Sequence, residues 1–256
     1  MIKIAFGLQK GGVGKTTSTI STGYALAKLG KRVLLVDSDP QANLTSSCLL
    51  DPRSFNLNIY DLFKKGSLKA SNAIVKTQWD FDLIPSSIVL ASAEVELVSA
   101  FQREQVLAEK FQELEGLGYD YVLTDSPPSL GLLTVNVLAA SDRVVMPVQC
   151  QLLSIMGLQA FIDVVELVQK INRTLRISGV LLTMYDPRTG VSREVENNVR
   201  EILGDLVFDT RIGNFTALSN IPRRGPIQVW EPKHPASQQY NAFAEELINR
   251  LEQESH

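Results

Sequence analysis

The sequence contains no apolar run long enough to cross a lipid bilayer, which argues against a membrane-spanning helix. Its two cysteines, Cys48 and Cys150, lie far apart and outside any metal-ligand spacing, so we expect neither a disulfide framework nor a zinc site. No long apolar signal core follows Met1, and we therefore expect a cytoplasmic protein. The net charge of −3 carries no basic excess, so any contact with nucleic acid has to come from a local basic surface.

The composition is that of an ordinary globular protein. The 256 residues are 45% hydrophobic and 21% charged, which is enough to bury a substantial core. Short apolar runs typical of buried strands alternate with helical patterns along the chain. This alternation predicts an α/β fold with a mostly parallel central sheet flanked by helices. We expect a single domain over residues 1–256.

The most informative stretch is Gln9–Thr17, which joins an apolar run at 2–6 to a helical pattern. Glycines in such a turn let the backbone curl around a polyphosphate, and the start of the following helix attracts an anion. Lys15 can reach the β and γ phosphates, and the Thr16 hydroxyl can ligate Mg²⁺. The sequence therefore predicts a phosphate-binding loop made of Lys10, Gly11, Gly12, Val13, Gly14, Lys15, Thr16 and Thr17.

The loop departs from the usual G-x-x-x-x-G-K-[ST] pattern in two ways. Gln9 stands where the first glycine is expected, and Lys10 is an additional lysine. With this second lysine the loop resembles the deviant Walker A loop of the ParA/MinD family of P-loop ATPases. The resemblance implies that Lys10 crosses a dimer interface to the partner's nucleotide.

Two aspartates follow the apolar strand at 33–37. Strands of a parallel sheet carry ligands at their carboxyl ends, so Asp37 and Asp39 are expected beside the phosphate loop. They match the Asp-x-Asp-Pro-Gln segment of the family, in which the second aspartate is associated with hydrolysis. An aspartate before proline is also common as a turn former, and this alternative stays open.

A third segment, Tyr121–Gly131, ends a strand with Asp125 and continues into Pro127 and Pro128. This is a Walker B arrangement, and it resembles the corresponding segment of ParA. Asp125 can hold a water in the Mg²⁺ shell, so the expected metal residues are Thr16 and Asp125. The Pro-Pro-Ser-Leu-Gly stretch is expected to act as a loop that senses the γ phosphate.

The remaining patterns fit the same fold. We expect strands at 81–85, 143–147 and 177–184, and one continuous helix over 91–115 with a solvated charged face. The final helix carries acidic residues that would repel an anionic membrane surface, so no membrane association is expected.

The late segment 208–225 follows the family in outline but not in detail. ParA proteins commonly carry Ile-Pro-Arg-Asn-x-Arg-Leu-Ser, whereas this chain has Gly213, Asn214, Phe215 and Ala217 at the corresponding Pro, Arg, Asn and second Arg. Phe215 could stack on the nucleotide base or belong to the core. A basic patch for DNA could be built from Arg188, Arg211, Arg223 and Arg224, and a scattered set of solvated arginines is the alternative.

The resemblance spans nearly the whole chain and implies a ParA-type partitioning ATPase that uses ATP and Mg²⁺. It implies an ATP-bound sandwich dimer that binds DNA nonspecifically, associates with the nucleoid, and is released when a ParB-like adaptor stimulates hydrolysis. Lys10, Lys15 and Asp39 are the expected catalytic residues. The absence of an Asn-Lys-x-Asp segment favours ATP over GTP. Two alternatives remain, a positioning or regulatory switch for a protein cargo or an organelle, and a metabolic enzyme that transfers phosphate.

Overall fold

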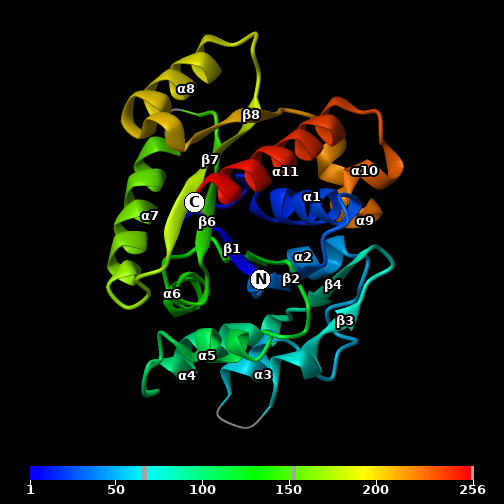
Figure 1. Ribbon diagram of the computed structural model, residues 1–256, viewed down its shortest axis with the longest axis vertical. Helices are drawn as coiled ribbons and strands as arrows, with labels where there is room; N and C mark the ends of the chain where they lie inside the picture. Colours follow the sequence, from blue (N-terminus) through cyan, green and yellow to red (C-terminus); the bar gives the residue numbers. More distant parts are fainter. Residues whose placement is uncertain (65–67, 152–153, 255–256) are drawn as a thin grey trace.

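The computed structural model describes residues 1–64, 68–151 and 154–254. Across these residues one sheet of eight strands forms the centre of the molecule, in the order β3-β4-β2-β5-β1-β6-β7-β8 (Figure 1). All neighbouring strands are parallel except β3 and β4. The predicted α/β fold with a mostly parallel sheet is confirmed. The strands are β1 (Ile2–Phe6), β2 (Val33–Asp37), β3 (Val75–Lys76), β4 (Phe81–Ile84), β5 (Tyr121–Asp125), β6 (Arg143–Gln149), β7 (Arg176–Tyr185) and β8 (Val207–Gly213).

Helices cover both faces of this sheet and create two cores. On one face α1, α2 and α9 to α11 pack through side chains such as Ile20, Phe243 and Leu247. On the other face α3 to α8 pack through side chains such as Phe111 and Phe161. The helices are α1 (Lys15–Lys28), α2 (Asn43–Ser47), α3 (Ile59–Phe63), α4 (Ala91–Leu97), α5 (Val106–Gln112), α6 (Leu132–Ala139), α7 (Ser154–Gln169), α8 (Gly190–Leu203), α9 (Ile221–Arg224), α10 (Ile227–Trp230) and α11 (Pro235–Gln253), with 3₁₀ turns at Ala70–Ala73, Ile88–Leu90, Gly204–Leu206 and Thr216–Asn220.

The inner strands are short and apolar because both faces of the sheet are covered. Every residue of β2 and β5 is buried, as the sequences VLLVD and YVLTD require. The two strands run in register, with Asp37 paired to Asp125, and Asp125 is also paired to Phe6 at the end of β1. The loops that follow β1, β2 and β5 therefore leave the sheet side by side at its carboxyl end.

The helix expected over 91–115 is wrong, because the structure divides it into α4 and α5. The backbone of Gln102 adopts a left-handed conformation with φ of 52°, which an α-helix cannot continue through. Asn136 of α6 holds this break: its side-chain amide donates to the carbonyl of Arg103 at 2.7 Å and its oxygen accepts from the N–H of Leu107 at 3.2 Å. Two short helices that each contact α6 replace the single helix.

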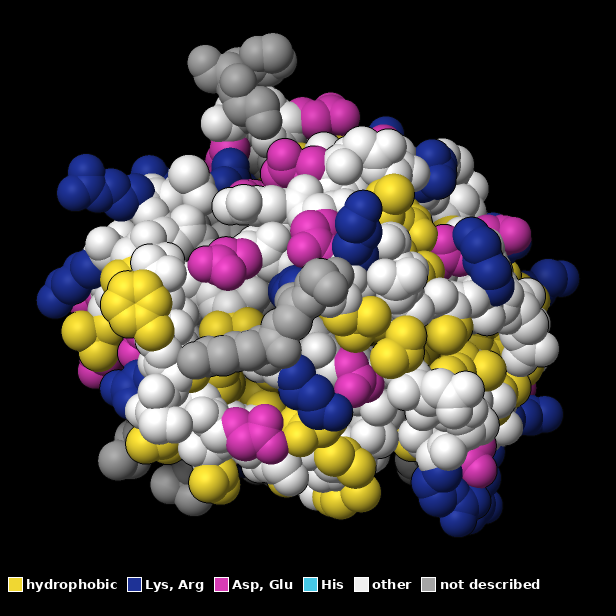
Figure 2. All heavy atoms as spheres, turned by 90° about the horizontal axis from the view of Figure 1, so that it is seen from below, with side chains coloured by type: hydrophobic (Ala, Val, Ile, Leu, Met, Phe, Trp, Pro, Cys, Tyr) yellow, Lys and Arg dark blue, Asp and Glu magenta, His cyan; other side chains and the backbone are white. Residues whose placement is uncertain are grey.

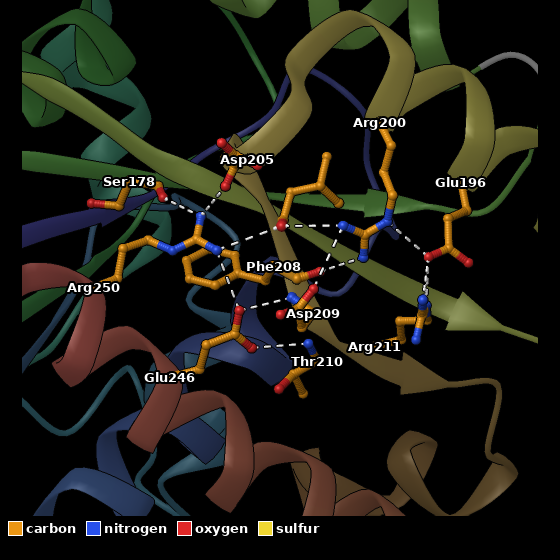
Figure 3. A network of polar contacts seen from close by, with 11 residues as sticks. Ser178, Glu196, Arg200, Asp205, Phe208, Asp209, Thr210, Arg211, Glu246 and Arg250 are labelled. Atoms are coloured by element: carbon orange, nitrogen blue, oxygen red, sulfur yellow. Dashed lines mark hydrogen bonds and ion pairs between the residues drawn. The ribbon is translucent and has the colours of Figure 1, made fainter.

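Edge strand β8 is covered by polar side chains from α8 and α11, as Figure 3 shows. Glu246 accepts hydrogen bonds from the backbone N–H groups of Asp209 at 2.7 Å and Thr210 at 2.9 Å. Arg200 donates to the carbonyl of Phe208 at 3.0 Å. These side chains satisfy backbone groups that an edge strand otherwise leaves open.

The surface near α3 to α5 carries charges of both signs. Figure 2 views the molecule from this side and shows Lys and Arg interleaved with Asp, Glu and apolar side chains, without a large area of one sign. None of the helices in the described ranges has the length and apolar character that crossing a membrane requires.

Candidate nucleotide site at the carboxyl end of the sheet

A cavity of about 600 Å³ opens at the carboxyl end of the sheet. It runs from the loop after β1 to the segment that joins β8 to α9, and its size is typical of small-molecule sites. Its lining residues are Gly11, Gly12, Gly14, Lys15, Thr16, Thr17, Asp39, Gln41, Asn43, Ser47, Pro128, Thr183, Met184, Ile212, Gly213, Asn214, Phe215, Thr216, Leu218, Ser219, Ile221, Pro222 and Tyr240.

The glycine loop at one end of this cavity has the backbone that an anion site needs. Gly12 and Gly14 adopt φ values of 73° and 91°, which residues with a Cβ rarely take. Gly14 is the N-cap of α1 and supplies no side chain, so the first N–H groups of the helix have no side-chain cap. Thr183 of β7 holds the loop by donating its hydroxyl to the carbonyl of Val13 at 2.8 Å. A row of uncapped N–H groups at a helix start favours a phosphate.

Lys15 lies almost fully buried at the same end and donates from Nζ to the carbonyl of Lys10 at 3.0 Å. Burial lowers the pKa of Lys15, and the carboxylates of Asp125 and Asp39 oppose this effect. Lys10 itself reaches Gln151, two residues after the end of β6, with 3.2 Å between Nζ and Oε1. The two lysines therefore have different partners, and of the two only Lys15 lines the cavity.

Asp125 is a fully buried carboxylate with one satisfied and one unsatisfied oxygen. Its Oδ2 accepts from the Thr16 hydroxyl at 2.6 Å, whereas its Oδ1 has no hydrogen-bond partner among the described residues. Burial, reinforced by the carboxylate of Asp37, raises the pKa of Asp125 well above its ordinary value. A carboxylate oxygen left open beside a hydroxyl is the kind of hard donor that Mg²⁺ takes, so these two side chains fit that ion.

Asp37 and Asp39 have different surroundings. Asp37 is buried and accepts from the N–H and the hydroxyl of Thr45, both at 2.7 Å, and burial raises its pKa to about 7. Asp39 lines the cavity, and its Oδ1 accepts from the N–H of Gln41 at 2.9 Å. Asp39 thus forms a turn and also lines the cavity, and its part in hydrolysis stays a prediction.

The other end of the cavity contains residues that sequence reasoning missed. Phe215 lines this end and also packs against the core on the α1 and α11 face, with its ring edge-on to His234 at 5.0 Å between centroids. Its stacking on a nucleotide base stays a prediction. Met184 and Pro222 line the same region without any motif to signal them. Tyr240 comes from α11, and its hydroxyl lies 3.3 Å from that of Ser18. The packing of α11 on α1 brings Tyr240 and Ser18 together.

Known proteins resemble the whole chain. Residues 1–177 match the family described as AAA domain. The sporulation initiation inhibitor protein Soj of Bacillus subtilis is 42% identical over 95% of this chain and 97% of its own length. The chromosome partitioning protein ParA of Caulobacter vibrioides is 39% identical over 96% of this chain and 94% of its own length. The chain belongs to the ParA/MinD family of P-loop ATPases.

A solved structure supports the fold of this ParA/MinD member. The crystal structure of cobyrinic acid a,c-diamide synthase from Mycobacterium smegmatis, with bound ADP and magnesium, is 35% identical to it. The two superpose with a TM-score of 0.86, covering 98% of this chain and 96% of that one.

The arginines proposed for DNA have different surroundings in this ParA/MinD chain. Arg188 is bonded to Asp186 at 3.0 and 2.9 Å, and it lowers the pKa of that carboxyl group to about 2. Arg211 is engaged by Glu196, which also binds Arg200 (Figure 3). The remaining pair, Arg223 and Arg224, is exposed on α9, where the Arg224 guanidinium lies 4.6 Å from the centroid of the Trp230 ring.

Proposed function

We propose that this ParA/MinD member is a ParA-type ATPase that partitions DNA, with residues 1–256 acting as one ATPase domain. ATP and Mg²⁺ bind in the cavity, and ATP-bound copies associate as a sandwich dimer. One observation carries the proposal. The Oδ1 of Asp125 is buried without a hydrogen-bond partner among the described residues, at the end of the strand next to β1, and β1 leads through the glycine loop to the uncapped start of α1. An unpaired carboxylate oxygen attracts a cation, and free N–H groups at a helix start attract an anion.

Each site residue has a role that its surroundings support. Lys15 and the loop N–H groups neutralise the phosphates, and Thr16 with Asp125 holds the metal. Mg²⁺, when bound, supplies positive charge that stabilises the leaving phosphate. Asp39 orients the attacking water from the cavity wall, and Lys10 leaves Gln151 to act across the dimer. Phe215 covers the base at the far end.

DNA and an adaptor are the proposed partners. The exposed guanidinium groups of Arg223 and Arg224 on α9 provide a nonspecific phosphate contact. Arg188 and Arg211 can add to it only after they leave Asp186 and Glu196. The names of the relatives Soj and ParA support a partitioning role. A ParB-like adaptor would then speed hydrolysis, release the dimer from DNA and end its association with the nucleoid.

The experiment that tests the proposal is a titration with ATP and Mg²⁺. We expect the wild-type protein to bind ATP and Lys15→Ala to lose binding, because the buried ammonium group contacts the loop from within the cavity. Lys28→Ala is a matched control, since Lys28 lies on the same helix but is exposed and paired with Asp80. Retained ATP affinity in Lys15→Ala, or no affinity in the wild type, would contradict the site.

A second candidate is a positioning ATPase for a protein cargo or an organelle, or a regulatory nucleotide switch. It is favoured by Gly213, Asn214 and Ala217, which replace residues of the family's late segment, and by the carboxylate partners of Arg188 and Arg211. Measuring ATP hydrolysis with and without nonspecific duplex DNA separates the two. Stimulation by DNA supports partitioning, and ATP-dependent binding of a protein without any DNA response supports the second candidate.

A further inference from the structure

Helix α6 begins with a carboxylate that comes from another helix. Glu94 of α4 accepts the N–H of Leu132 through Oε2 at 3.1 Å and the N–H of Leu133 through Oε1 at 3.2 Å. The N-cap residue, Gly131, has no side chain and cannot cap the helix itself. A negative charge that receives two N–H groups at a helix start stabilises that start. Helix α4 therefore fixes the first turn of α6.

The segment that precedes α6 is the Pro-Pro loop, residues 126–131, which lies beside the cavity. Its first residue is attached to the sheet, because the Ser126 hydroxyl donates to the carbonyl of Phe6 at 2.8 Å. In its middle, Pro128 lines the cavity, and a Cβ built on Gly11 would lie 4.0 Å from it. Its last residue, Gly131, lies against the Glu94 carboxylate, which accepts from the next two N–H groups. The middle of the loop is also held, because the Thr134 hydroxyl of α6 donates to the carbonyl of Ser129 at 2.7 Å. The loop is thus fixed by the sheet at one end and by α6, whose start Glu94 caps, at the other.

Gly131 leaves the space that this carboxylate occupies. A Cβ at this position would lie 2.5 and 2.8 Å from the two carboxylate oxygens of Glu94. The backbone of Gly131 has an ordinary φ of −77°, so a side chain would be tolerated there apart from this contact. The Glu94 carboxylate can therefore occupy this position only because residue 131 is a glycine.

We propose that Glu94 is a positioning residue that holds the Pro-Pro loop for contact with the γ phosphate. This inference rests on the proposed function, since it concerns the same cavity. Lys15 marks the β and γ phosphate end of the site, and Pro128 lines that cavity beside Gly11. Loops in this position are ordered by the γ phosphate. Fixing the far end of the loop lowers the entropy lost on closure, so Glu94 favours ATP over ADP.

The test compares two nucleotides on the same variants. Dissociation constants are measured with Mg²⁺ for ADP and for a non-hydrolysable ATP analogue. We expect Glu94→Ala to weaken the analogue about fivefold, the factor that a helix cap of about 1 kcal/mol represents, and to leave ADP unchanged. Glu94→Gln keeps one amide oxygen as an acceptor, so its affinity for the ATP analogue should fall between those of the wild type and Glu94→Ala. A purely structural role would weaken both nucleotides alike, and that result would overturn the proposal.

Two further variants keep the test decisive even if Glu94→Ala folds poorly. Gly131→Ala should displace the carboxylate and weaken the ATP analogue by a similar factor, yet add nothing in a Glu94→Ala background. Glu96→Ala is the control, because Glu96 lies on the same helix but bonds the Tyr60 hydroxyl at 2.8 Å. Additive effects of Gly131→Ala and Glu94→Ala, or an equal effect of Glu96→Ala, would refute the inference. If the wild-type protein binds neither nucleotide, the proposed function fails instead.

Discussion

Replacing Asp125 by asparagine should stabilise the protein without Mg²⁺ and remove most of its response to Mg²⁺ with nucleotide. The reason lies in the pairing of β2 with β5, which places the Asp37 and Asp125 carboxyl groups at adjacent strand ends, both fully buried. Among the residues that the structure describes, the Oδ1 of Asp125 has no partner, and the nearby Asp37 carboxylate raises the pKa of Asp125 further. An amide at this position keeps an acceptor for the Thr16 hydroxyl and removes the repulsion.

The magnitude follows from the loss of the charge alone, because the Asn NH2 group that replaces Oδ1 would also lack a partner. An uncompensated buried charge costs several kcal/mol, and we take a gain of about 2 kcal/mol. With an unfolding entropy of about 2.1 cal/mol/K per residue and 256 residues, a gain of about 2 kcal/mol corresponds to a rise of about 4 °C in Tm. In the wild type, nucleotide with Mg²⁺ at about 100 times its Kd adds about 2.7 kcal/mol, or about 5 °C. Asp125→Asn should lose most of this second increment.

Thermal unfolding followed by circular dichroism measures both effects, first with a chelator and then with Mg²⁺ and a non-hydrolysable ATP analogue. Asp80→Asn serves as the matched control, because Asp80 is exposed and carries the same change of charge away from the cavity. A lower Tm of Asp125→Asn in the chelator, or an undiminished increment with Mg²⁺ and nucleotide, would refute the reasoning.

Three other outcomes are expected. Asp39→Ala should bind ATP but hydrolyse it at least tenfold more slowly in a steady-state assay, and an unchanged rate would remove Asp39 from the mechanism. The raised pKa of Asp37, about 7, means that its contribution to stability is complete below about pH 4 and is lost as the pH rises through 7, by at most about 4 kcal/mol. Denaturant unfolding of Asp37→Asn should therefore show a flatter pH dependence than the wild type, and equal slopes would be evidence against the shift. Arg223→Glu with Arg224→Glu should weaken DNA binding and reduce its salt dependence in a mobility-shift assay, and unchanged binding would point to another surface.

The phosphate end of the site could be predicted from the sequence because local rules determine it. The glycines and Lys15 form a loop between a strand and a helix, and this context defines an anion site. Asp39 and Asp125 follow apolar strands, and parallel strands end at the same edge of a sheet. Their places could therefore be deduced without coordinates.

The rest depends on contacts between distant segments. The break between α4 and α5 depends on Asn136, which lies 33 residues after its partner Arg103. The ion pair of Arg211 with Glu196 and the cap that Glu94 supplies to α6 likewise join separate helices and strands. Helical periodicity over 91–115 carries no information about these partners, so it predicted one helix where two exist.

The polar cover of β8 also restricts how two copies of this chain can meet. Glu246 and Arg200 already use the outward backbone groups of Asp209, Thr210 and Phe208, so another chain cannot lengthen the sheet there without displacing both. The opposite margin, β3, offers only two residues, the second of them a lysine. Continuous intermolecular sheets are thus discouraged at both edges, so two copies have to meet through helices or loops rather than by extending the sheet.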